Sequence, residues 1–114
     1  MRFGFHLRGD AALIAQLGGD MQLALYRIAQ EAATNTIKHA RASRFDVHLR
    51  LARRGNAVLA LLDVRDNGAG FASTQESTER HFGLRGLRDR VTALNGRLLV
   101  ASDSSGTRLH ALLR

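Results

Sequence analysis

Four polar side chains with the chemistry to hold a metal ion and an anion share one face of a predicted helix. Residues 21–40 contain neither glycine nor proline, which favours one long helix. Within it, Glu31, Asn35, Lys38 and His39 follow at i, i+4, i+7 and i+8, which at about 100° per residue is one face. A carboxylate or amide oxygen suits Mg²⁺, and an ammonium suits a phosphate. The same spacing is also typical of a solvated face with a simple ion pair.

One aspartate breaks the pattern of a predicted strand. Apolar residues alternate through residues 57–65, and one further step places Asp66 on the apolar face. An unpaired carboxylate in a core is costly, so a hydrogen-bond donor must meet Asp66. Gly68 and Gly70 follow, where backbone can turn tightly or lie flat against a ligand. The alternative is a strand-terminal aspartate that opens a turn.

Two glycines, Gly83 and Gly86, lie at the predicted start of a second helix, whose apolar residues continue from Leu84 to Leu94. Glycines before a helix expose backbone N–H groups and the positive end of the helix dipole, which favours a phosphate. A plain junction between loop and helix would look the same. The chain contains no phosphate loop and no dinucleotide-binding glycine motif, so the common nucleotide folds are not supported.

The remaining pattern predicts the elements that must position these residues. Asp20 is the predicted N-cap of the first helix, and residues 72–81, which are almost free of apolar side chains, are expected to form a mobile loop. Asn95 and Gly96 should end the second helix. A half-buried strand is predicted at residues 3–7, and two hairpins at 45–65 and 97–113. This order favours an α+β fold: a two-layer α/β sandwich with a mixed, mostly antiparallel sheet and helices on one face.

Composition limits the class of protein. The chain has 114 residues, which is typical of one domain, and 45% of them are hydrophobic, which favours a folded core. The absence of cysteine excludes disulfides, thiolate zinc sites and cysteine nucleophiles. A net charge of +7 is compatible with nucleic-acid binding. However, the arginines are scattered and only 5% of residues are aromatic, so no base-stacking platform is visible and no nucleic acid is expected.

Three segments together resemble a known family. Residues 25–40, LYRIAQEAATNTIKHA, are similar to an asparagine box, residues 64–71, VRDNGAGF, to a first glycine box, and residues 82–90, FGLRGLRDR, to a second. Their order resembles the ATP-binding catalytic domain of sensor histidine kinases, within the ATPase group that includes gyrase, Hsp90 and MutL. The resemblance covers residues 20–112 and is closest to the subfamily of nitrate, hexose-phosphate and membrane-fluidity sensors.

The resemblance implies roles for the residues on the first helix. Asn35 would hold Mg²⁺, and Lys38 and His39 would approach the phosphates of ATP. Glu31 stands where hydrolysing relatives have a general base and would help to position metal or water.

The other motif residues would surround the base. Asp66 would accept the amino group of adenine and so reject guanine, which carries a carbonyl there. Gly68 and Gly70 would lie against base and ribose, and Thr107 would help to bind adenine through water. Near the phosphates, residues 72–81 would form a lid over ATP. The residues that would shape the phosphate-facing end of this loop are Gly83, Leu84 and Gly86.

The resemblance also implies a function for a longer protein. Residues 1–114 would be a single catalytic domain, the C-terminal fragment of a sensor kinase, because none of the five histidines matches the phosphoacceptor motif. The domain would bind Mg²⁺-ATP in the cytoplasm, and the parent, anchored in the inner membrane, would transfer the γ-phosphoryl group to a histidine of its dimerisation domain and act on a response regulator. The alternatives are a stand-alone serine kinase of the anti-sigma-factor type and a basic nucleic-acid-binding module.

Overall fold

The computed structural model of the chain describes residues 1–68 and 74–114, and the side chains of residues 39–40 and 74–83 lie outside that description. Two long helices and five strands make up most of the fold. The elements in chain order are β1 Arg2–Arg8, η1 Ala11–Gln16, α1 Gly19–Asn35, η2 Thr36–Ala40, β2 Arg44–Arg54, β3 Ala57–Asp66, α2 Thr74–Ala93, β4 Arg97–Asp103 and β5 Gly106–Leu113.

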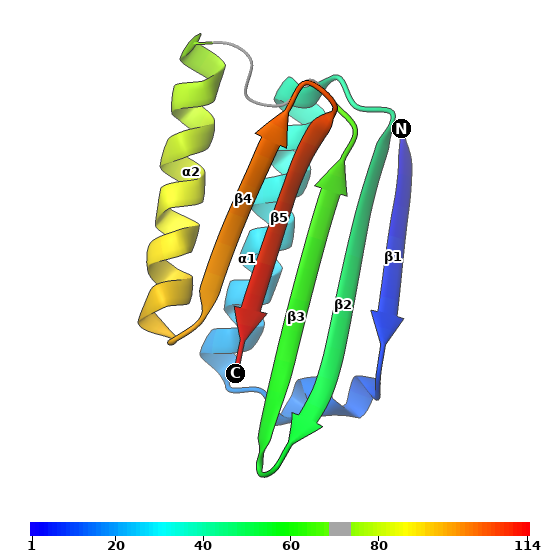
Figure 1. Ribbon diagram of the computed structural model, residues 1–114, viewed down its shortest axis with the longest axis vertical. Helices are drawn as coiled ribbons and strands as arrows, with labels where there is room; N and C mark the ends of the chain where they lie inside the picture. The colour runs from blue at the N-terminus through cyan, green and yellow to red at the C-terminus, as the bar shows by residue number, and fades with distance from the viewer. Residues whose placement is uncertain (69–73) are drawn as a thin grey trace.

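The strands form one sheet in the order β1-β2-β3-β5-β4 (Figure 1). β1 runs parallel to β2, and the other three neighbouring pairs are antiparallel. Both predicted hairpins are present, and β5 of the second hairpin pairs with β3 of the first. This pairing sets Thr107 directly opposite Asp66, 41 residues away in the chain.

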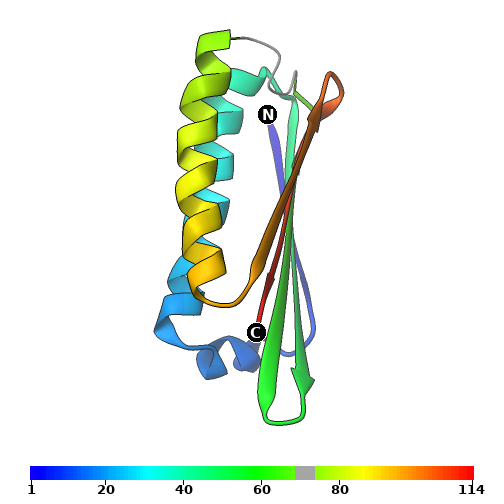
Figure 2. The same cartoon turned by 60° about the vertical axis from the view of Figure 1, so that its left-hand side comes forward.

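Figure 2 shows α1 and α2 side by side on the same face of the sheet. Alternate strand residues face these helices and are buried, because each strand presents successive side chains to opposite faces. Ile28 of α1, Val91 of α2 and Leu113 of β5 are fully buried in this layer. The predicted two-layer sandwich, with a mostly antiparallel sheet and helices on one face, is confirmed.

The first strand differs from its prediction in burial. β1 forms as expected, but Phe3 and Phe5 are 64% and 67% exposed rather than half-buried. The strand lies at the edge of the sheet, on the side away from α2 (Figure 1). The ring of Phe3 meets that of the buried Phe45 edge-on, with centroids 6.0 Å apart. Alternation correctly indicated a strand, but it could not indicate that the strand would be an edge.

The first helix has different ends from those predicted. Gly18 is the N-cap, and Asp20 lies inside the first turn, where its charge still complements the helix dipole. The α-helix ends at Asn35, and residues Thr36–Ala40 form a wider π-helical turn that ends at Arg41 in the left-handed conformation. Lys38 and His39 therefore do not continue the regular α-helical spacing from Glu31 and Asn35.

The second helix is longer than predicted. α2 begins at Thr74, so residues 74–81 are helical and not a loop, while residues 72 and 73 lie outside the described residues. The segment lacks apolar residues but also lacks proline, and its Gln, Glu and Arg residues are good helix formers. The predicted end is confirmed: Asn95 is left-handed with φ 60°, and Gly96 N–H donates to Val91 O at 2.9 Å.

Candidate functional site

A small cavity lies between the helices and the inner face of the sheet, at the end of β3. Its volume is about 20 Å³, room for about one water molecule. α1, α2 and three strands contribute its walls. The lining residues are Ala32, Asn35, Phe45, Val64, Asp66, Leu84, Thr107 and Leu109. Four predicted site residues from four separate segments, Asn35, Asp66, Leu84 and Thr107, are therefore brought together.

Asp66 is the polar centre of this cavity. As predicted from the alternation, it lies on the same face of β3 as the buried Val64. Its Oδ2 accepts a hydrogen bond from Thr36 Oγ1 at 2.9 Å, and its Oδ1 accepts from the backbone N–H groups of Gly68 at 2.9 Å and Thr107 at 3.3 Å. The donors that this carboxylate requires are thus supplied within the protein, and all three are neutral.

Thr36 is a residue of the candidate site that the sequence reasoning missed. Its side chain is buried, with 1% exposed, and its Oγ1 lies 2.8 Å from Ala32 O and 2.9 Å from Asp66 Oδ2. A hydroxyl has one proton, and the charged carboxylate is the stronger acceptor of the two. The only signal in the sequence was a hydroxyl on the apolar stripe of α1, beside Asn35. Its partner lies 30 residues further along the chain.

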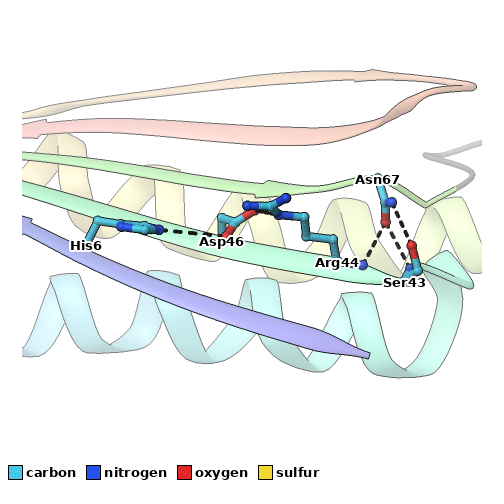
Figure 3. Close-up of polar contacts among 5 residues, drawn as sticks. All are labelled: His6, Ser43, Arg44, Asp46 and Asn67. Atoms are coloured by element: carbon cyan, nitrogen blue, oxygen red, sulfur yellow. Dashed lines mark hydrogen bonds and ion pairs between the residues drawn. The ribbon is translucent and has the colours of Figure 1, made fainter.

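The backbone at Asp66 is held in place by contacts toward both β2 and β5. On the β2 side, Asn67 Oδ1 accepts from Ser43 N and Arg44 N, each at 2.9 Å, and Asn67 Nδ2 donates to Ser43 Oγ at 2.8 Å (Figure 3). On the β5 side, Gly106 has φ 143°, and a Cβ there would lie 2.0 Å from Asp66 O. Glycine is required at position 106 so that β5 can approach β3 closely enough for Thr107 N–H to reach the carboxylate.

The polar residues of the first helix are only partly gathered at the cavity. Asn35 is half-buried and lines it, and Glu31 is half-buried one turn earlier without lining it. Lys38 is exposed on the π-helical turn, and the side chain of His39 is outside the described residues. Among the described residues, no cluster of three or more acidic or imidazole ligands could hold a metal ion by itself. An ion here would need other ligands besides Asn35.

The second glycine motif is placed differently from its prediction. Gly83 and Gly86 lie inside α2 and not before its N-terminus, so their N–H groups belong to the helix ladder and form no anion site of the predicted kind. Among the described residues, a Cβ at Gly86 would meet no atom within 4 Å. Leu84 is buried and closes one side of the cavity. Gly70 lies outside the described residues.

The opposite face of β3 carries a second aspartate in a different setting. Asp63 forms ion pairs with Arg65 at 2.8 Å and Arg108 at 3.0 Å. Burial by itself would raise the pKa of Asp63, but the hydrogen bonds and positive charges of the two arginines outweigh it and hold this pKa below its usual value. Asp63 therefore stays charged, and its charge is neutralised within the protein.

Residues 20–114 match the family described as "Histidine kinase-, DNA gyrase B-, and HSP90-like ATPase". The chain belongs to this ATPase family. All of the residues that line the cavity fall within the matched range. In the described part of this ATPase domain, none of the helices has the length and apolar character that crossing a membrane requires.

Several curated relatives of this ATPase domain are sensor kinases. Sensor histidine kinase ComP of Bacillus subtilis is 40% identical over 90% of the chain, and the histidine-protein kinase/phosphatase DegS of Brevibacillus brevis is 40% identical over 70%. The nitrate/nitrite sensor protein NarQ of Escherichia coli is 38% identical over 79%. The chain spans 13%, 19% and 15% of these three proteins, respectively, so it corresponds to a small part of each.

Solved structures share the fold of this ATPase domain. The histidine kinase domain of the blue-light activated kinase EL346 from Erythrobacter litoralis matches with a TM-score of 0.57 and 22% identity, over 97% of this chain and 54% of that one. The kinase AdeS of Acinetobacter baumannii matches with a TM-score of 0.56 and 15% identity, over 81% of this chain and 46% of that one. The predicted fold and family are therefore both confirmed.

Proposed function

We propose that this chain binds ATP together with Mg²⁺ at the cavity around Asp66, and that it is the catalytic domain of a longer sensor histidine kinase. The observation that carries the proposal is the Asp66 carboxylate, which neutral donors hold in a cavity with mostly apolar walls. Such a carboxylate keeps its negative charge available for a ligand. Family membership supports ATP as that ligand.

The adenine end of the nucleotide belongs at Asp66. A carboxylate offers about four acceptor positions, and Thr36, Gly68 and Thr107 occupy three of them among the described residues. The remaining position on Oδ2 would accept the exocyclic amino group of adenine. Guanine presents a carbonyl oxygen there, which would leave two acceptors facing each other, so the site should select strongly for adenine.

Entry of a base requires the cavity to widen. Its volume of about 20 Å³ admits a water molecule and not a purine, so Leu84 of α2 and Asp66 of β3 must move apart. Moving α2 should cost less free energy than moving β3, because β3 is hydrogen-bonded to neighbouring strands on both sides. We expect nucleotide binding to shift α2 relative to the sheet.

The phosphate end belongs beside the C-terminal part of α1. The amide oxygen of Asn35 fits a Mg²⁺ ion, which prefers few protein oxygens and completes its shell with phosphate and water. When bound, the ion would supply charge neutralisation at the phosphates. Lys38 would contact the phosphates as a point charge, and His39 would lie next to it in the chain. Glu31 would orient water or metal from one turn earlier.

In the parent protein, the domain would position the γ-phosphoryl group of ATP for attack by a histidine on a separate dimerisation domain. Its residues would contribute mainly by orientation and charge neutralisation. The parent would pass the phosphoryl group to a response regulator, with this domain in the cytoplasm and the parent anchored in the inner membrane. The histidine-kinase names of the relatives ComP and DegS support this proposal.

Calorimetric titration with ATP and Mg²⁺ tests the site. Asp66→Asn should weaken ATP binding by about tenfold or more, because it removes the charge and reverses part of the hydrogen bonding. Asp63→Asn is the matched control on the same strand, and it should leave ATP affinity within about twofold of wild type. Equal effects of the two substitutions, or undiminished binding by Asp66→Asn, would contradict the assignment.

A second experiment tests the proposed reaction. The chain is incubated with labelled ATP, alone and with the dimerisation domain of its own parent. Acid-labile label should appear on the added domain and not on the chain itself. Acid-stable label on a serine would instead favour a stand-alone serine kinase.

A further inference from the structure

One face of the sheet is not covered by the helices (Figure 2). This open face carries basic side chains on several neighbouring strands. Arg8 of β1 is in register with Arg50 of β2, and both are exposed. One row further along, His6 is in register with His48, and their rings stack with centroids 4.5 Å apart. The row continues through Asp63 of β3.

Arg8 and Arg50 form an uncompensated pair of like charges. Residues in register on neighbouring strands are close enough for their side chains to interact, and like charges at such positions destabilise the sheet. Within residues 1–68 and 74–114, neither guanidinium forms an ion pair or hydrogen bond with a carboxylate. The pair would therefore be stabilised by an anion from outside the protein.

The aspartates of β2 and β3 on the open face are already engaged in ion pairs. Asp63 is held by Arg65 and Arg108. Asp46 accepts from Arg44 at 2.6 Å, and His6 Nε2 lies 4.0 Å from its other oxygen (Figure 3). Arg8 and Arg50 thus remain as cations that a ligand can use.

A depression with a volume of about 300 Å³ lies at the arginine pair. Its polar lining consists of Arg8, His48, Arg50, Asp63, Arg65 and His110. The Nδ1 atom of His110 is buried and has no hydrogen-bond partner among the described residues.

We propose that this depression binds a phosphate group, either as free inorganic phosphate or as the end of a small phosphomonoester. Two guanidinium groups offer paired N–H donors that match the geometry of phosphate oxygens. The exposed imidazole of His48 adds a further nitrogen, and Asp63 is neutralised by Arg65 and Arg108. The volume accommodates a phosphate group and leaves space for a small substituent.

This site is distinct from the ATP cavity. Asp66 and Thr107 face the helices, whereas Arg65 and Arg108, their neighbours in sequence, lie on the opposite face. The sheet separates the two sites, so phosphate bound to the open face does not occupy the nucleotide position.

Amide chemical shifts in two-dimensional NMR spectra can locate the site. Titration of the whole chain with inorganic phosphate should shift the amides of residues 8, 48, 50 and 110, and potassium chloride at equal ionic strength should not. Glycerol 3-phosphate, titrated separately, distinguishes the two sources: tighter binding than inorganic phosphate favours a phosphomonoester, and weaker binding favours the free ion. Shifts confined to residues 35, 66 and 68 would overturn the proposal.

Charge variants provide the decisive control. Arg8→Gln and Arg50→Gln should each weaken phosphate binding by about tenfold, since each removes charge-assisted hydrogen bonds. Arg54→Gln removes the same charge from the same face of β2 outside the depression, and it should change the affinity by about twofold at most. Equal losses in all three variants would show only a diffuse charge effect and would overturn the site. Asp66→Asn should retain phosphate binding, which separates this test from that of the ATP cavity.

Discussion

Each face of β3 carries an aspartate, and the partners of the two carboxylates differ in charge. Asp63 and Asp66 are three residues apart, yet Asp63 is paired with two arginines and Asp66 is held by a hydroxyl and two backbone N–H groups. Guanidinium partners neutralise a carboxylate, whereas neutral donors orient it and leave its charge intact. The structural carboxylate and the candidate binding carboxylate can therefore be told apart by the charge of their partners.

The largest expected difference between the two faces is in stability. Asp66→Ala would leave the backbone N–H groups of Gly68 and Thr107 without their acceptor and would restrict the buried Thr36 hydroxyl to Ala32 O, so it should lower the free energy of unfolding by about 2 to 4 kcal/mol. Asp63→Ala leaves only exposed arginines unpaired and should cost about 1 kcal/mol or less. Urea unfolding of both variants measures the difference. Equal losses of unfolding free energy in the two variants would show that the two carboxylates contribute equally to stability, whatever the charge of their partners.

A second prediction concerns the hydroxyl that Asp66 depends on. Thr36→Val keeps the shape of the side chain but removes its proton, and it should cost about 1 to 2 kcal/mol of unfolding free energy. It should also reduce the preference for ATP over GTP, because Oδ2 loses the donor that orients it. Thr36→Ser restores the hydroxyl and should recover the preference. A valine variant with wild-type selectivity would limit Thr36 to packing.

Gly86 lies in α2 and on neither face of β3. Its substitution tests whether α2, like Asp66, contributes to nucleotide binding. Alanine is favoured over glycine inside a helix, and a Cβ here meets no atom of the described residues, so Gly86→Ala should raise the free energy of unfolding by about 0.5 to 1 kcal/mol. Thermal unfolding measures this gain. If ATP affinity falls in the same variant, the glycine serves the nucleotide, as the family resemblance implies. Unchanged affinity would remove Gly86 from the site.

The smallest effect is the acid dependence of Asp63. Because its pKa is lowered in the folded protein, its ion pairs stabilise the fold at neutral pH, and this stability is lost as the pH falls through the folded-state pKa. At neutral pH, wild type should be more stable than Asp63→Asn by about 1 kcal/mol or less, since both arginines are half exposed, and urea unfolding should show this difference shrinking below about pH 4. A steeper fall in the variant than in wild type would reverse this assignment.

Much of the fold was predictable because it follows from short-range patterns. Alternation over residues 45–65 and 97–113 indicated both hairpins, and it also placed Asp66 on the inner face. The start of α2 was wrong because residues 74–81 have no apolar period, although they form helix. The exposure of β1 was missed for a related reason, since alternation carries no information about which strand lies at an edge.

The site was predictable in its residue types and less so in its contacts. Asn35, Asp66, Leu84 and Thr107 were all identified from motifs and do meet at one cavity. Thr36 was not identified, because a buried threonine on a helix has no distinctive sequence pattern. The positions of Glu31, Lys38 and His39 relative to a nucleotide stay predictions, and the π-helical turn changes the spacing on which they were based.

The sequence by itself showed that Asp66 occupies a position where the alternation of the strand calls for an apolar residue. It therefore identified Asp66 as a residue that needs a hydrogen-bond donor. Backbone geometry has a fixed local period, and a departure from that period is visible without any structure. Only the tertiary structure decided that the partners are Thr36, Gly68 and Thr107, and that Asp63 faces arginines instead. Two of these partners come from segments 30 and 41 residues away, and packing brings them together.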